Sequence, residues 1–280
     1  MNDVTARILR RPLTMLGLVI VAVHLVVALA GTLIAPFDPF KLLDAPLEPP
    51  NAQYWLGTDE LGRDFLSRLV VGGRISIVVA FTSAFIAAFG GGLIGLASAF
   101  YRGIFDDAVS RFVEMKLAIP AILFVSLFVT GFGQSPLVLV IVIAVIKMMG
   151  VIRTARAQGI VLAEHGYVKA AMLRGDSGPA IILLEMLPNI ADLLAVEFAL
   201  RTSSALLLVS SLSFLGLGIS PPTPDWGMMI HDGLSAIRSE PWLILAPALC
   251  ISTLVIGVNF ATEGITDAFG LEAARGTAGH

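Results

Sequence analysis

Charge is scarce in this sequence. Only 14% of its 280 residues are charged, whereas 56% are hydrophobic, and the mean hydropathy of +0.88 lies well above that of soluble domains. A soluble core cannot bury so much apolar surface. A bundle of membrane-spanning helices can, at about 20 residues for each crossing of about 30 Å. The composition therefore predicts an all-α integral membrane protein.

Cysteine is nearly absent too, since Cys250 is the only one. A single cysteine forms no internal disulfide and no cysteine-based metal site. His231 stands beside Asp232, but such a pair is more typical of a solvated loop than of a metal site. The glycine-rich loop ending in Gly-Lys-Ser or Gly-Lys-Thr, which holds nucleotide phosphates, is also missing. We therefore expect this chain to bind no metal and no cofactor.

Six apolar runs predict six transmembrane helices. They cover approximately residues 13–35, 75–100, 117–131, 135–150, 192–219 and 241–265. The first run follows a basic lead, residues 1–12. We interpret this run as a retained anchor rather than a signal peptide, because it is long and no small-residue cleavage pattern follows it. Residues 36–74 are polar and rich in proline, so we expect them to lie outside the hydrocarbon.

Two features inside these runs predict how the helices pack. Gly91 and Gly95 form a small-xxx-small pair, with Ala87 one turn earlier, which predicts a close helix contact. His24 lies in the first run, where we expect a hydrogen-bonded histidine.

The distribution of lysine and arginine predicts that both termini are cytoplasmic. With the N-terminus inside, twelve of these residues fall in inside segments and five in outside segments, and Arg201 falls within a span. Residues 36–74 then lie in the periplasm or outside the cell. Residues 151–191 form a long cytoplasmic loop, and residues 271–280 form a cytoplasmic tail. The inside set is Arg7, Arg10, Arg11, Arg102, Arg111, Lys116, Lys147, Arg153, Arg156, Lys169, Arg174 and Arg275.

One cytoplasmic stretch, MLRGDSGPA at residues 172–180, contains two familiar motifs. An RGDS adhesion signal must face outside the cell, which this topology excludes. GDSGP resembles a serine-protease nucleophile loop, but no histidine and acid cluster supports Ser177. Gly175 instead stands where a C-cap glycine would end a helix over approximately residues 163–174, with Pro179 in the first turn of the next helix.

Three segments carry a family resemblance. YVKAAMLRGDSGPAIILLEMLPN (residues 167–189) is similar to the cytoplasmic loop of ABC-importer permeases. WLGTDELGRDFLSRLVVGGRIS (55–76) and LSFLGLGISPPTPDWGMMI (212–230) resemble the dipeptide, oligopeptide and nickel permease family, in its C-type subunit. The resemblance covers roughly residues 30–270. It implies the type I ABC-importer permease fold, with a five-helix permease core over residues 75–270.

The resemblance implies a non-catalytic subunit of an ATP-driven importer in the inner membrane of a prokaryote. Its partners would be a homologous second permease subunit, two ABC ATPase subunits that use ATP and Mg, and an external substrate-binding protein. Peptides are the first substrate class we expect. Nickel chelates, glutathione-like compounds and opines stay open, because specificity in such systems resides largely in the binding protein.

The resemblance also implies that the helix at residues 163–174 fits a groove on an ATPase. Tyr167, Ala170 and Ala171 are expected to face that groove, and Gly175 to set the turn that aims the helix. The full set of expected coupling residues is Tyr167, Val168, Ala170, Ala171, Gly175, Ser177 and Pro188.

The fifth run contains charged residues. Glu197 and Arg201 have i,i+4 spacing, so they share a helix face and can pair, and Ser204 and Ser211 extend that face. A charge at the centre of a span costs roughly 2.5 to 3.5 kcal/mol on insertion scales. Two interpretations stay open: a structural ion pair between packed helices, or a polar lining of the translocation path.

Residues 55–74 and the loop before Trp226 are expected to receive the binding protein. The candidate docking residues are Asp59, Arg63, Asp64, Asp225 and Trp226. A stand-alone secondary transporter is the alternative from another class, but no inverted repeat is evident. A membrane-embedded hydrolase has no nucleophile, base and acid cluster to support it.

Overall fold

The computed structural model describes residues 11–268, and the predictions for residues 1–10 and 271–280 lie outside this range. Within the described range the chain is helical, and its extended segments form only the isolated bridge between Thr58 and Asp64. The α-helices are α2 (Pro12–Ile34), α3 (Phe65–Tyr101), α4 (Gly103–Ala118), α5 (Ala121–Phe132), α6 (Pro136–Ala163), α7 (Gly166–Arg174), α8 (Gly178–Ala180), α9 (Ala191–Phe214), α10 (Trp226–Asp232) and α11 (Trp242–Ala268). A π-helical segment, η1 (Ile181–Met186), and two 3₁₀ segments, η2 (Leu187–Ile190) and η3 (Gly233–Ala236), complete the order.

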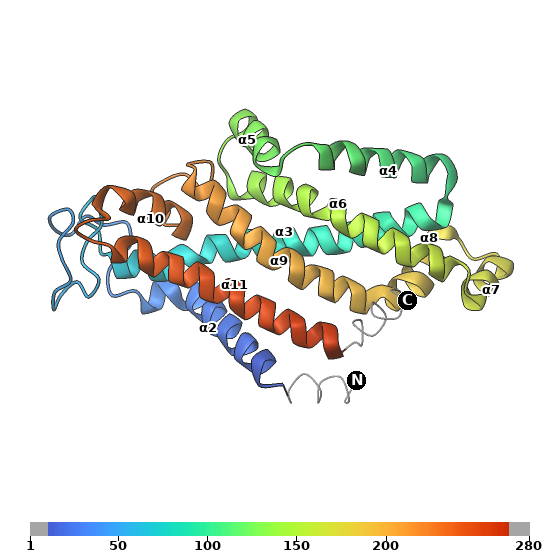
Figure 1. The fold of residues 1–280 in the computed structure, drawn as a ribbon, viewed down its shortest axis with the longest axis horizontal. Helices are drawn as coiled ribbons and strands as arrows, with labels where there is room; N and C mark the ends of the chain where they lie inside the picture. The colour runs from blue at the N-terminus through green and yellow to red at the C-terminus, as the bar shows by residue number, and fades with distance from the viewer. Residues whose placement is uncertain (1–10, 269–280) are drawn as a thin grey trace.

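The long helices lie lengthwise beside one another, with different structures at the two ends of the bundle (Figure 1). Residues 35–64 and α10 gather at one end, which we call the cap. The short helix α7 lies at the opposite end, which we call the α7 end. Helix α2 runs toward the cap and α11 runs away from it (Figure 1).

Five helical segments are long and apolar enough to cross a membrane, and a bent pair makes a possible sixth. The predicted all-α membrane class is therefore confirmed. The five are Pro12–Ile34, Phe65–Tyr101, Pro136–Ala163, Gly178–Phe214 and Trp242–Gly264.

The predicted third span, residues 117–131, is wrong as a single straight helix. It contains the end of α4 and most of α5, which meet at an angle of 92°. The break falls at Ile119 and Pro120, where Ile119 is extended with φ −91° and ψ 123°. Proline lacks an N–H group and disfavours a helical conformation in the residue before it. The bend is therefore a local consequence of this sequence.

Helix α6 also differs from the prediction, because it continues to Ala163 instead of ending near residue 150. Its 28 residues give a length of about 42 Å, more than the hydrocarbon layer of about 30 Å. Lys147, which the orientation count assigned to an inside segment, lies within α6.

Helix α3 is central and contacts α2, α6 and α9. A β-carbon at Gly91 would lie 2.8 Å from Cβ of Val151, and one at Gly95 would lie 2.7 Å from the carbonyl oxygen of Ile152. Any larger residue would push α3 and α6 apart. The close helix contact predicted from this glycine pair is confirmed.

Helix α2 packs along α11, and His24 lies between them. Its Nδ1 atom is 2.9 Å from the carbonyl oxygen of Ile20, and its Nε2 atom is 3.3 Å from Oγ1 of Thr253. The prediction of a hydrogen-bonded membrane histidine is confirmed.

Candidate functional site

Gly175 ends α7 in the way that the sequence predicts. Its φ of 82° and ψ of 20° are left-handed, a conformation that glycine adopts without a steric penalty. The Gly175 N–H donates to the carbonyl of Met172 at 3.0 Å, and the Asp176 N–H donates to that of Ala171 at 3.2 Å. This pair of bonds is a Schellman motif. Ser177 stands at the N-cap position of α8, but its side chain makes no capping bond.

One face of α7 packs on the rest of the chain. Val168 and Ala171, both 0% exposed, share an apolar cluster with Ile181 and Met186 of η1. The expectation that Ala171 faces a partner is therefore wrong in this structure. Ala171 follows Val168 by three residues, so both lie on the same side of α7, and η1 covers that side.

The opposite face of α7 is open. Leu173 is 90% exposed, and Ala170 and Met172 are also exposed. Tyr167 is half-buried, and its hydroxyl has no hydrogen-bond partner within the described range. Burial, and then the charge of Glu185, raises the pKa of Tyr167. The sequence contained a signal that could have identified Leu173 as exposed, because this large apolar side chain stands next to Arg174 at a helix end.

Ion pairs fix both ends of α7. At its start, Glu164 accepts from Arg102 at 2.8 Å and pairs with Lys169 at 3.0 Å. The hydrogen bond from Arg102, followed by that from Lys169, holds the pKa of Glu164 below its usual range. At its end, Arg174 pairs with Asp176 at 2.8 Å and with Glu185 at 3.4 Å. Exposed pairs contribute little stability individually, but these connect α7 to α3 and to η1.

The stretch after α7 leads into the segment Gly178–Phe214, which has the lowest mean hydropathy of the five candidate spans. Pro188, one of the expected coupling residues, is exposed and lies in η2. Because proline has no N–H, it cannot donate the bond that a regular helix requires there. The helix accordingly passes through η1 and η2 before α9 becomes regular at Ala191.

Glu197 and Arg201 form the predicted ion pair on α9. The Nη2 and Nε atoms of Arg201 lie 2.5 and 2.9 Å from Oε2 of Glu197. Thr154 of α6 donates to Oε1 of Glu197 at 3.0 Å. Glu197 is buried, while Arg201 is partly exposed and lies over Gly150 of α6, where a β-carbon would be 3.0 Å from its Nη2. The pair therefore joins α9 to α6.

Ser204 and Ser211 lie on the same helix but are satisfied locally. Ser204 donates to the carbonyl of Arg201 at 3.1 Å, and Ser211 donates to that of Leu207 at 2.7 Å. Their oxygens can still accept hydrogen bonds. A polar lining formed by these serines stays a prediction.

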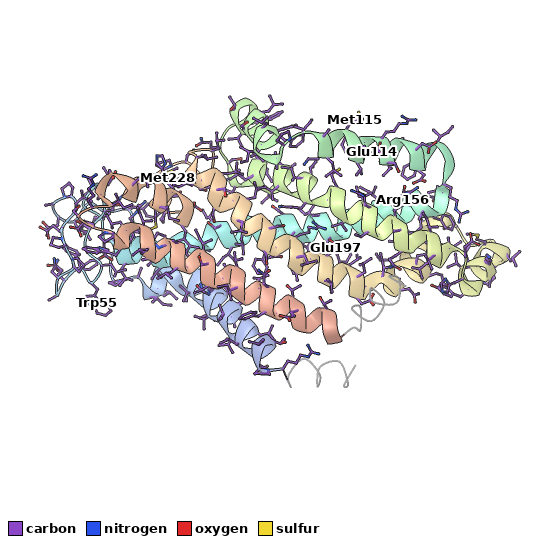
Figure 2. The ribbon with its side chains drawn as sticks, in the orientation of Figure 1. Trp55, Glu114, Met115, Arg156, Glu197 and Met228 are labelled. Atoms are coloured by element: carbon purple, nitrogen blue, oxygen red, sulfur yellow. The ribbon has the colours of Figure 1, made fainter. Side chains whose placement is uncertain are left out.

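A second charged junction joins α4 to α6, and no sequence pattern pointed to it. Arg156 donates two hydrogen bonds to Asp106, at 2.5 and 2.6 Å, and Ser98 also donates to Asp106. A cavity of about 420 Å³ lies beside Arg156, with Glu114 and Arg153 among its lining residues. Figure 2 labels Glu114 on α4 and Arg156 on α6.

The expected docking residues hold the cap together. Asp59 pairs with Arg63 at 2.7 Å and with Arg68 at 3.1 Å. Asp64 caps α3 by accepting from the N–H of Ser67 at 2.8 Å. All three expected residues in this segment, Asp59, Arg63 and Asp64, are buried.

The other two expected docking residues are buried as well. Asp225 caps α10, accepting from the N–H groups of Gly227 and Met228 at 3.0 and 3.2 Å, and from Ser76 of α3. Burial raises the pKa of Asp225. Trp226 donates to the carbonyl of Leu69 at 2.8 Å. The exposed side chains of the cap are others, such as Trp55, which is 70% exposed. The five residues thus shape the cap from within.

Comparison with known proteins agrees with this architecture. Residues 91–270 match the family described as binding-protein-dependent transport system inner membrane component. Residues 1–50 match the N-terminal transmembrane domain of oligopeptide transport permease C.

Several bacterial permeases are similar over most of the chain. The di/tripeptide transport system permease protein DppC of Pseudomonas aeruginosa is 34% identical, over 90% of this chain and 86% of its own length. The oligopeptide transport system permease protein OppC of Haemophilus influenzae is 36% identical, over 84% and 78%. The glutathione transport system permease protein GsiD of Escherichia coli O6:K15:H31 is 32% identical, over 94% and 87%. This chain therefore belongs to the binding-protein-dependent transport system inner membrane component family, as a multi-pass, non-catalytic permease subunit.

Proposed function

We propose that this permease subunit serves an ATP-driven importer of di- or oligopeptides. Relatives named for di/tripeptide and oligopeptide transport support this substrate class. The relative named for glutathione transport makes glutathione, itself a tripeptide, the second candidate. Nickel chelates and opines rank behind both.

The observation that carries the proposal is the construction of α7. Its inner face packs on η1 through Val168 and Ala171, its C-terminus is closed by Gly175, and its outer face exposes Leu173. An exposed apolar residue on a short, firmly held helix suits a groove on a soluble protein. Force on α7 would pass through η1 and η2 into α9 as a rigid-body displacement. This is the behaviour required of an element that couples ATPase closure to the membrane.

In this proposal, α7 and both termini lie on the cytoplasmic side of a bacterial inner membrane. Two ATPase subunits that use ATP and Mg meet α7, and the cap faces the periplasm and receives the binding protein. A homologous second permease subunit completes the path. The opposite placement of the cap and α7 (Figure 1) supports this orientation.

Purification and transport test the proposal together. The chain, tagged and purified from its native membrane, is expected to bring a second permease and two ATPases with it. Proteoliposomes containing this complex are expected to take up the dipeptide Ala-Phe only with ATP and the binding protein. Uptake by the chain alone, driven by an ion gradient, would instead identify a secondary transporter.

A competition assay separates the two substrate candidates. Ala-Phe uptake that excess glutathione leaves unchanged would assign a peptide importer that excludes glutathione. Glutathione uptake without Ala-Phe uptake would assign the narrower substrate.

A further inference from the structure

Lys116 is a buried cation in an apolar environment. It lies in the last turn of α4 and is only 6% exposed. Its Nζ atom stands 5.4 Å from the ring centroid of Phe124 on α5. In the part of the chain that the structure describes, Lys116 belongs to no ion pair. A buried ammonium group is costly unless a counter-charge or hydrogen-bond acceptor compensates it, and a cation–π contact supplies only part of that compensation.

The Lys116 side chain lines a cavity of about 380 Å³ between α4, α5 and α6. The bend at Ile119 and Pro120 opens this space, because it turns α5 across α6 instead of continuing α4. A cavity of this size suits one or two amino-acid side chains. Apart from Lys116, every lining residue is apolar: Phe112, Met115, Ile119, Phe124, Phe128, Ile141, Val142 and Val145.

The surroundings of this cavity are also positively charged. Lys147 of α6 is half-buried, experiences the positive charges of Arg201 and Lys116, and is in no ion pair within residues 11–268. Arg201 is neutralised by Glu197, which leaves two uncompensated lysines. An ammonium group would be repelled here, whereas a carboxylate would be attracted.

We propose that this cavity is a transient site for the C-terminal end of a peptide in transit. The terminal carboxylate accepts a hydrogen bond from Nζ of Lys116, and the last side chain of the peptide lies among the apolar residues. The assignment rests on the proposed function, because it requires a peptide in the membrane path. In this proposal Lys116 holds the substrate inside the permease, and this contact is separate from recognition by the binding protein.

Charge variants of Lys116 test the site in the complete transporter. Ala-Phe uptake is measured in proteoliposomes at saturating, loaded binding protein, together with ATP hydrolysis. We expect Lys116→Gln to lower uptake about tenfold, the value of one charge-assisted hydrogen bond, while stimulated ATP hydrolysis persists. Lys116→Arg should retain most of the uptake. Arg111→Gln is the matched control, because it removes the same charge from the same helix. Arg111 is exposed and does not line the cavity.

Three outcomes would overturn the site. The first is equal uptake by Lys116→Gln and the wild type. The second is loss of the second permease from purified Lys116→Gln, which would show that a carboxylate of that subunit pairs with the lysine. The third is a parallel loss of uptake and ATP hydrolysis, which would indicate a structural role. If the wild type imports no peptide at all, the proposed function itself fails.

A photoprobe locates the peptide directly without any substitution. Ala-p-benzoylphenylalanine, shown to be delivered by its competition with Ala-Phe uptake, is photolysed in the wild-type complex during turnover. We expect adducts on Met115 or Phe112, which line the cavity. Adducts confined to residues outside it would contradict the proposal.

Discussion

At residue 175 the backbone turns left-handed, with φ of 82°, and this angle decides what the position tolerates. A β-carbon there would meet no atom within 4 Å, so space is not the constraint. The left-handed conformation costs a non-glycine residue roughly 1–2 kcal/mol. The sequence predicted this turn correctly because the requirement is local and glycine satisfies it.

Substitution of Gly175 tests whether the turn aims α7. We expect Gly175→Leu to reduce coupled uptake about tenfold, because a strain of roughly 1–2 kcal/mol corresponds to about a tenfold change in an equilibrium. Membrane insertion and basal ATP hydrolysis should persist. Gly166→Ala is the control, since Gly166 begins the same helix with open space around it and no positive φ. Wild-type uptake and substrate-stimulated hydrolysis in Gly175→Leu would refute the role of this turn.

The Glu197 and Arg201 pair yields a prediction of another kind. Arg201→Met leaves a buried carboxylate without its partner, which costs about 3–5 kcal/mol. The double variant with Glu197→Gln removes both charges and should be clearly more stable. The thermal unfolding midpoint of the detergent-solubilised complex measures both. Unchanged uptake by the double variant at normal expression would assign the pair to structure alone.

At the scale of elements, α7 shows where sequence reasoning reached its limit. The end of the helix at its final glycine is a local property and was predictable. Its start was predicted at residue 163, which is wrong, because Ala163 ends α6 and α7 begins at Gly166. Which face is buried depends on η1, and η1 exists because Pro188 interrupts the following helix. Ala171 therefore faces inward and Leu173 outward, an arrangement that helical spacing alone did not distinguish.

The outward face of α7 can be tested at Leu173. Burying a leucine at an interface contributes about 1.5–3 kcal/mol, so Leu173→Ser should reduce ATPase co-purification at least about tenfold. Leu173→Met keeps the apolar contact and should behave as the wild type. Equal ATPase recovery from both variants would mean that Leu173 is not part of the interface.

The corner between α6 and α7 should respond to acid. The pKa of Glu164 is lowered in the folded chain, so its ion pairs stabilise the fold above its ordinary pKa of about 4.3. This contribution disappears as the pH falls through the lowered value. The difference in unfolding midpoint between the wild type and Glu164→Gln should be constant from pH 6 to 8 and vanish in stronger acid. A difference that changes across pH 6 to 8 would contradict this assignment.

For the molecule as a whole, hydropathy was sufficient to predict an all-helical membrane bundle, and the glycines of α3 predicted its close contact with α6. Hydropathy could not place the bend at Pro120, because an apolar run has the same composition whether it is straight or broken. It also could not show that Asp59, Arg63 and Asp225 are buried. Asp225 accepts from Ser76, far away in the chain, and such a partner is visible only in the fold. Asp59 pairs with the nearby Arg63 and Arg68, but the sequence pattern did not show that these charges are buried together.

Site-specific crosslinking tests the central claim most directly, and the scarcity of cysteine makes it practical. In a Cys250→Ser background, Leu173→Cys places a single thiol on α7 and Leu61→Cys places one on the exposed cap. In the intact complex, we expect the thiol at 173 to crosslink to an ATPase subunit and the thiol at 61 to the binding protein. A crosslink from 61 to an ATPase, or none from 173 to an ATPase, would contradict the orientation and the coupling role together.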